Sequence, residues 1–175
     1  MQKMLIIYVL LSVIIPSIFF LSFIAYQLLF PWIYSKKLHY IDSQKYQLAL
    51  YLSKNPQFTK GKVEFRVYNH SYRQDDIAFI HILNSRVIFI SSSYLNDPYL
   101  YVIIAHELGH IENGMGDWIL TDRTEMINEV KADFFSVKIC GINRVLDASN
   151  YHDLPEFRRN MIIQMRCLLD IRPEF

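Results

Sequence analysis

The chain has 175 residues, 52% of them hydrophobic and 20% charged, and its formal net charge at pH 7 is +1. This composition is too apolar for an intrinsically disordered chain, and Gly and Pro are too few for collagen or a long linker. A neutral chain without a basic patch also argues against nucleic acid as the main partner. Its cysteines, Cys140 and Cys167, cannot make a disulfide scaffold, so we expect them to pack as small hydrophobic side chains.

The first part of the chain predicts a membrane helix. Residues 4–35 contain no Asp, Glu, Lys or Arg, and an apolar run covers residues 5–30. About 20 apolar residues are enough to span a bilayer as a helix, which tolerates a proline such as Pro16. A cleaved signal peptide has a shorter apolar core, of about 7–15 residues, followed by a small-x-small cleavage site. We therefore expect residues 1–35 to be an uncleaved single-pass anchor and residues 36–175 to form a separate domain.

The charges beside the apolar run predict the orientation of the chain in the membrane. Lys36, Lys37 and Lys45 follow the run, partly offset by Asp42, whereas only Lys3 and the amino terminus precede it. Loops rich in Lys and Arg stay on the cytoplasmic side of a membrane. The prediction is therefore a membrane protein whose larger domain lies in the cytoplasm.

Downstream of the anchor, the sequence changes between strand and helix patterns. Alternating or β-branched runs indicate strands, whereas apolar residues at helical spacing between capping residues indicate helices. In chain order we expect a helix at 43–54, strands at 62–69, 77–83 and 86–91, and helices at 97–113, 122–140, 144–148 and 155–171. Asn84-Ser85 is a two-residue connection typical of a hairpin between the last two strands. A few strands within a mostly helical chain predict an α+β domain.

Capping residues define the ends of the two central helices. Asp97 is the predicted N-cap of the first, with Pro98 at the first helical position, and Gly114 is its predicted C-cap. The second helix opens with the capping-box pattern at residues 122–125 and ends before Gly141. These two helices carry the residues with the clearest chemistry.

The first central helix contains the motif His106-Glu107-Leu108-Gly109-His110. Residues four apart share a helix face, so His106 and His110 can direct two imidazole nitrogens to one point, where zinc accepts them at about 2.0–2.1 Å. Glu107 can instead reach a metal-bound water and act as a general base for hydrolysis. A glycine inside a helix costs roughly 1 kcal/mol relative to alanine, so Gly109 predicts a close approach of the second helix.

A chance pair of histidines on an amphipathic helix is the plainer explanation of this motif. Apolar residues 102–105 argue against it, because two histidines and a glutamate are costly to bury in such a core without partners. Candidate partners exist on the second helix. The other histidines, His39, His70 and His81, lack metal-like spacing, so we expect them on the surface or hydrogen-bonded in the core.

A catalytic zinc site has three protein ligands and one open position. Candidates for the third ligand are Glu125, Glu129 and Asp133, which share one face of the second helix at i, i+4 and i+8. Spacing alone does not separate Glu125 from Glu129, and a solvated acidic stripe is the alternative to both. A further carboxylate can accept a hydrogen bond from the far nitrogen of a ligand histidine and fix its tautomer.

These residues resemble a known family. The motif at 106–110, followed by Glu129-Val130-Lys131-Ala132-Asp133, is similar to the gluzincin pattern of HtpX-like and CAAX prenyl protease-like membrane zinc metallopeptidases. The resemblance covers residues 77–159 and implies a zincin-like, mainly helical domain with a small hairpin sheet. It implies that Glu129 is the third zinc ligand and that Asp133 supports a ligand histidine from the second shell of the site.

The predicted reaction is hydrolysis of a peptide bond. Zinc at this site polarises the substrate carbonyl and a bound water, and Glu107 moves the proton of that water to the leaving amine. Arg158, His152 and Tyr151 are the candidates to stabilise the oxyanion, and the first two resemble a segment that follows the second helix in the family. The strand at 77–83 can pair with an extended peptide substrate if it lies at a sheet edge.

The sequence therefore predicts a membrane-anchored zinc endopeptidase that acts on a peptide or protein substrate. The alternative is a catalytically weak or inactive regulatory or binding protein that keeps the fold and the metal. The intact Glu107 favours the enzyme, because a purely structural metal site has no use for a general base there. A structural membrane protein with a chance motif would require Glu129 and Asp133 to be coincidental as well.

Overall fold

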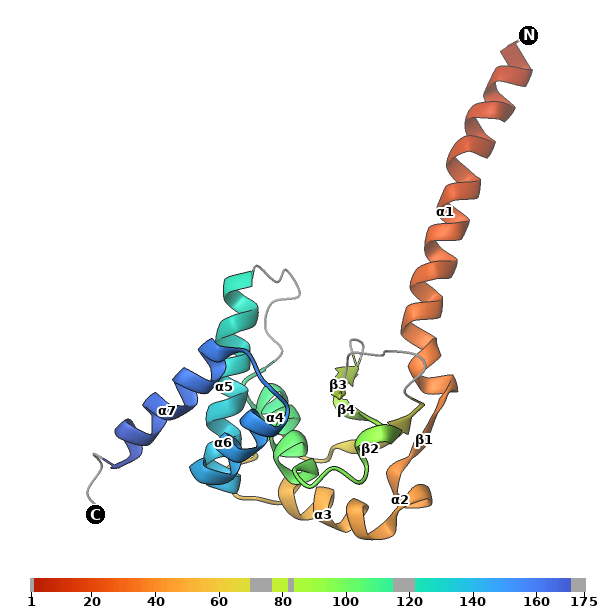
Figure 1. Cartoon of the computed structure of the whole chain (residues 1–175). Coiled ribbons are helices and arrows are strands. Elements are labelled where there is room, and N and C mark those ends of the chain that lie inside the picture. The colour runs from red at the N-terminus through yellow and green to blue at the C-terminus, as the bar shows by residue number, and fades with distance from the viewer. Residues whose placement is uncertain (1, 70–76, 82–83, 115–121, 171–175) are drawn as a thin grey trace. The chain divides into compact units, whose positions relative to one another are not determined.

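A computed structural model describes residues 2–69, 77–81, 84–114 and 122–170 of the chain (Figure 1). The chain separates into two compact units, Met1–Ser35 and Lys36–Phe175. Over the described residues it is an α+β structure with seven α-helices and one four-stranded mixed sheet, as the sequence predicts.

The first unit consists of helix α1 (Gln2–Ile33), which contains Pro16 and Pro31. Its stretch Ser12–Ile33 has 22 residues and a mean hydropathy of 2.1, and none of its described apolar 18-residue window is buried. Large apolar side chains are therefore exposed, and Phe19 reaches 72%. Apolar surface of this extent is unfavourable in water. The helix is long and apolar enough to cross a membrane, although a signal sequence has the same character.

The sheet has four short strands in the spatial order β1-β2-β4-β3. The strands are β1 (Ser35–Lys37), β2 (Glu64–Tyr68), β3 (Ala78–His81) and β4 (Asn84–Ser91). β2 and β4 are parallel, with Phe65 opposite Ile88, whereas β3 and β4 are antiparallel, with Phe79 opposite Phe89. β3 therefore lies at one edge of the sheet.

The sheet agrees with the predicted strands in all but one connection. The strand expected at 62–69 is β2, and the expected hairpin is the β3–β4 pair. The predicted turn at Asn84-Ser85 is wrong, because Asn84 already pairs with His81 as the first residue of β4. The connection that remains, residues 82–83, lies outside the described residues. Local patterns do not predict β1 or the parallel pairing, since neither joins neighbouring segments of the chain.

Helices make up most of the second unit. They are α2 (Leu38–Ile41), α3 (Ser43–Ser53), α4 (Leu100–Glu112), α5 (Asp122–Cys140), α6 (Ile142–Tyr151) and α7 (Glu156–Asp170). The predicted N-cap of α4 is wrong: Asp97 accepts the backbone N–H of Tyr99 at 2.7 Å, which holds a turn ahead of the helix. The predicted cap at the other end is confirmed, because Gly114 follows α4 with a φ of +73°. α6 is longer than the short helix expected at 144–148.

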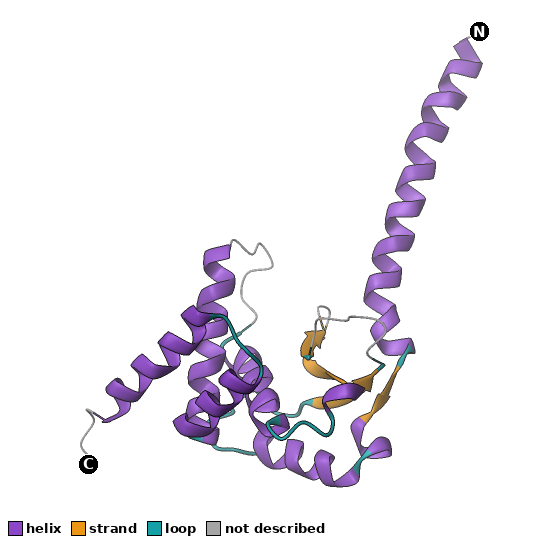
Figure 2. Ribbon diagram, viewed as in Figure 1, coloured by secondary structure: helices purple, strands orange, loops and turns teal. Residues whose placement is uncertain are grey.

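Helix α4 lies between two hydrophobic clusters. The first joins α4 to the sheet and to α3 and includes Phe65, Ile88, Ile104, Leu108 and Phe135. The second joins α4 to α5, α6 and α7 and includes Val102, Val137, Val145 and Ile162. Figure 2 shows the strands on one side of α4 and these three helices on the other. Burial on two sides explains the continuous apolar run that precedes the histidine motif.

Candidate metal centre

The histidine motif lies on α4, and Gly109 brings α5 close to it. A Cβ atom at Gly109 would lie 2.8 Å from Cα of Ala132, 2.9 Å from its carbonyl oxygen and 2.9 Å from Cβ of Phe135. Only glycine permits so close an approach, so the predicted packing of the second helix against Gly109 is confirmed. Glu129 and Asp133 lie on α5 on either side of Ala132, and the same approach brings them to the histidines.

Three side chains from the two helices converge on one point. Nε2 of His106 lies 3.0 Å from Nε2 of His110, and these nitrogens lie 3.2 Å from Oε2 and Oε1 of Glu129, respectively. The three ligand atoms lie within 4.8 Å of one another and can hold a metal ion. Two ligands about 2.0–2.1 Å from a tetrahedral zinc ion lie about 3.3–3.4 Å apart, and the separations of 3.0–3.2 Å between these side chains are close to that value.

Asp133 and Arg158 hold His106 from behind. The Nδ1–H group of His106 donates to Oδ1 of Asp133 at 2.9 Å, which leaves the lone pair of Nε2 for the convergence point. Arg158 on α7 donates to both carboxylate oxygens of Asp133, at 2.9 Å from Nε and 2.6 Å from Nη2. Its Nη1 also lies 2.8 Å from Oε2 of Glu129. One guanidinium group therefore orients both carboxylates.

The electrostatics of this centre favour a positive charge. Burial alone lowers the pKa of His106, but hydrogen bonds to Asp133 and Glu129 outweigh it and raise this pKa to about 9. Burial also opposes ionisation of the two carboxyl groups. Hydrogen bonds from the histidines to Glu129, and from His106 and Arg158 to Asp133, nevertheless hold both carboxyl pKa values below their usual range. A divalent cation supplies the same kind of charge and competes with the proton on His106.

Glu107 is buried next to the two histidines. Its exposed fraction is 8%, and burial raises the pKa of its carboxyl group, although the charges of His110 and His106 partly oppose this. Among the described residues, no side chain or backbone group donates a hydrogen bond to Glu107. A carboxyl group with a raised pKa in such a place is suited to accept a proton.

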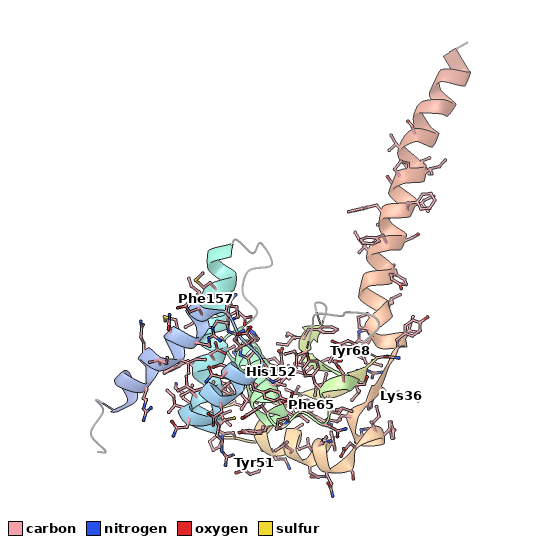
Figure 3. All side chains as sticks on the ribbon, viewed as in Figure 1. Lys36, Tyr51, Phe65, Tyr68, His152 and Phe157 are labelled. Carbon is pink, nitrogen blue, oxygen red and sulfur yellow. The ribbon has the colours of Figure 1, made fainter. Side chains whose placement is uncertain are left out.

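The structure separates the three candidates for oxyanion stabilisation. Arg158 lies at the centre, beside Glu129. His152, which is labelled in Figure 3, instead places its Nε2 3.4 Å from Oδ1 of Asp97. Tyr151 is 61% exposed, and its ring lies 5.0 Å from that of His152. Their roles in a reaction remain predictions.

Sequence reasoning missed one part of the centre and left another open. It considered Arg158 for the oxyanion but not for its contacts with Asp133, which lies 25 residues earlier in the chain. No local spacing signals a contact of this kind. Spacing alone did not separate Glu129 from Glu125, the family resemblance favoured Glu129, and the structure brings Glu129 to the histidines. The side chain of Glu125 lies outside the described part of the chain.

The fold and these contacts define an α+β domain with a His-His-Glu group consistent with a metal site of the His-Glu-x-x-His type. No family model matches the chain. Searches of curated proteins and of solved structures likewise find no match. The resemblance to membrane metallopeptidases therefore depends on the motif residues and on their geometry.

Proposed function

We propose that this protein is a zinc-dependent endopeptidase that is anchored in a membrane and hydrolyses peptide or protein substrates. The observation that carries the proposal is the convergence of His106, His110 and Glu129 within 4.8 Å, with Glu107 buried beside them. Structural zinc sites have four protein ligands, whereas catalytic sites have three and an open position. The described residues supply three.

Zinc is the proposed metal because of the donor atoms. Two imidazole nitrogens and one carboxylate are a common ligand set of catalytic zinc, while calcium and magnesium prefer oxygen ligands alone. Thiolates are not among the converging atoms. The hydrogen bond from His106 to Asp133 adds the outer partner that ligand histidines commonly have.

In the proposed hydrolysis, Glu107 and Arg158 have different roles beside the bound metal. A bound zinc ion supplies Lewis-acid chemistry and lowers the pKa of a water molecule. Glu107 accepts the proton of the attacking water and delivers it to the leaving amine, a task to which its raised pKa is suited. Arg158 is the favoured donor to the oxyanion, because it lies beside Glu129 and only three of its five N–H groups contact Glu129 and Asp133.

The substrate is proposed to bind in an extended form along β3. This strand lies at the edge of the sheet, where an extended peptide can add as a further strand. β3 also packs against α4, the helix that carries the histidines. Pairing at this edge would direct a peptide past the metal centre.

The test uses the purified full chain and three variants. We expect about one zinc per chain in the wild type, loss of zinc in Glu129→Ala, and retention of zinc in Glu125→Ala. Glu107→Gln should keep its zinc and lose peptide hydrolysis by about 10²–10⁴-fold, because it keeps the side-chain shape and removes the base.

Three outcomes would count against parts of the proposal. A folded wild type that takes up no zinc excludes the metal. Equal activity in wild type and Glu107→Gln excludes the proposed base. A wild type that binds zinc and hydrolyses no peptide fits the alternative, a regulatory or binding protein that keeps the metal.

The membrane part of the proposal is a single uncleaved anchor with the second unit in the cytoplasm. Its support is the exposed apolar stretch Ser12–Ile33 and the basic residues Lys36 and Lys37 that follow it. Mass spectrometry of the intact protein from the membrane fraction should show that the apolar stretch Ser12–Ile33 is retained. A mature protein that begins after residue 30 would show a cleaved signal sequence instead.

A further inference from the structure

A cavity separate from the metal centre lies between the end of α4 and the outer face of α5. Its volume is about 470 Å³, within the range of small-ligand sites. Phe134 and Phe135 of α5 line it, together with Gln57 from the loop after α3 and Asn113 from the end of α4. None of the three residues of the metal centre lines this cavity.

Two lysines of α5 give this cavity positive charge. Lys131 and Lys138 line it, and no carboxylate of a described residue forms an ion pair with either. They are seven residues apart, so they share one helix face about 10 Å apart along the axis. Phe134 lies between them, and the Lys138 ammonium group lies 4.4 Å from the centre of its ring.

The one acidic residue that lines the cavity is already bound elsewhere. Glu112 accepts hydrogen bonds from the backbone N–H of Thr59 at 2.8 Å and from its hydroxyl group at 2.6 Å. The backbone N–H of Thr59 donates to Oε2 of Glu112, and its hydroxyl group donates to Oε1. The cavity therefore combines two lysines without acidic partners, an aromatic wall and a carboxylate that is directed to Thr59.

We propose that this cavity binds an acidic peptide segment in a polyproline II conformation, with two carboxylates on one face about 9 Å apart. A polyproline II chain has three residues per turn and rises about 3.1 Å per residue, so side chains three residues apart share one face about 9 Å apart, close to the axial spacing of Lys131 and Lys138. The amide side chains supply hydrogen bonds to the ligand backbone. Asn113 donates one N–H to the carbonyl of Gly109 at 2.7 Å, which leaves its own carbonyl oxygen as an acceptor.

This site does not rest on the proposed peptidase activity, because its residues are not those of the metal centre. The test measures binding of a rhodamine-labelled peptide with two glutamates three residues apart to the full chain in detergent. The double variant Lys131→Gln/Lys138→Gln should bind about tenfold more weakly. The matched control, Lys36→Gln/Lys37→Gln, removes the same charge outside the cavity and should bind within about twofold of the wild type.

Three results would overturn the proposal. The first is equal weakening by both double variants, which would show a general charge effect. The second is equal binding of a peptide with glutamines in place of its glutamates. The third is displacement of the peptide by an equal concentration of inorganic phosphate, which would show a site for single anions.

Discussion

Two histidine–carboxylate contacts lie along α4, one at the middle of the helix and one just ahead of its first residue, and they differ in their surroundings. At the middle of α4, His106 donates to Asp133 through Nδ1 and turns Nε2 toward His110. At the amino end, His152 turns Nε2 itself toward Asp97, at 3.4 Å, without a hydrogen-bond partner among the described residues. Rings of Tyr94, Tyr99 and Tyr151 lie within 5.0–6.4 Å of that imidazole.

This difference shows that a histidine beside a carboxylate is not by itself a metal centre. At His106 the carboxylate occupies the nitrogen that faces away, so the other nitrogen can meet two more ligand atoms. At His152 the carboxylate of Asp97 faces Nε2, aromatic rings lie beside the imidazole, and the described residues bring no group of three ligand atoms together there. The tight contact of Gly109 with α5 completes the first arrangement, because it supplies Glu129.

The largest effect is expected from Gly109→Ala, which disturbs the contact between α4 and α5 that brings Glu129 to the histidines. Gly109→Ala places a methyl group less than 3.0 Å from Cα and the carbonyl oxygen of Ala132, so α4 and α5 must move apart. Overpacking of this kind costs about 1–3 kcal/mol, and the better helix propensity of alanine returns only about 1 kcal/mol. We expect a lower midpoint of thermal unfolding and weaker zinc binding.

Gly61→Ala is the matched control for this change. Gly61 has a φ of +85°, so alanine there is also strained, but a Cβ would meet nothing within 4 Å. This variant should lose some stability and keep its zinc affinity. Unchanged zinc affinity in Gly109→Ala would separate the helix contact from the metal centre.

The next prediction tests the support of His106 without moving a helix. Asp133→Asn keeps the size of a side chain that is 3% exposed and removes the charge that holds the Nδ1–H group and Arg158. Loss of such a partner lowers metal affinity by about 10–100-fold. Zinc titration against a chelator measures it, with the exposed Asp147→Asn as control. Equal affinity in wild type and Asp133→Asn would contradict the supporting role.

The third prediction concerns the contact between Asp97 and His152, just ahead of the first residue of α4. Asp97→Ala removes the acceptor for the backbone N–H of Tyr99 and leaves His152 without its carboxylate. We expect a loss of about 1 kcal/mol in the free energy of unfolding, since one part-buried hydrogen bond is lost. Zinc affinity should stay within about twofold of the wild type, because Asp97 does not touch the metal centre. A loss of zinc affinity as large as that of Asp133→Asn would show that the two histidine–carboxylate contacts are energetically coupled.

These contacts also show how far the sequence predicts the molecule. The histidine spacing is local to one helix, so the sequence suffices to predict that His106 and His110 share a face. Which glutamate reaches the histidines depends on the position of α5 along the axis of α4. The contact of Gly109 with Ala132 sets this position, and a contact between two helices cannot be read from local spacing. The hairpin strands were predictable from local patterns, whereas the parallel pairing of β2 with β4 depends on segments far apart in the chain. The start of α4 was misplaced because Asp97 caps a turn instead of the helix.

The smallest expected effect concerns Glu112, which lies at the end of α4 outside both histidine contacts. Burial opposes its ionisation, but the hydrogen bonds from Thr59 outweigh this and lower the pKa of Glu112. Its unfolded form therefore binds more protons near pH 4 than its folded form, so stability rises with pH in this range. The contribution is present above the usual pKa of 4.5 and is lost as the pH falls through the lower folded value.

Glu112→Gln should flatten this part of the pH profile of the unfolding midpoint, by well under about 1 kcal/mol, because the group is partly exposed. Glu156→Gln makes the same change at an exposed position of α7 and serves as the control. Equal slopes in wild type and Glu112→Gln would show that the bonds to Thr59 do not hold in solution. Because Glu112 also lines the cavity with Lys131 and Lys138, the substitution removes the one acidic group there, and binding of the acidic peptide should strengthen slightly.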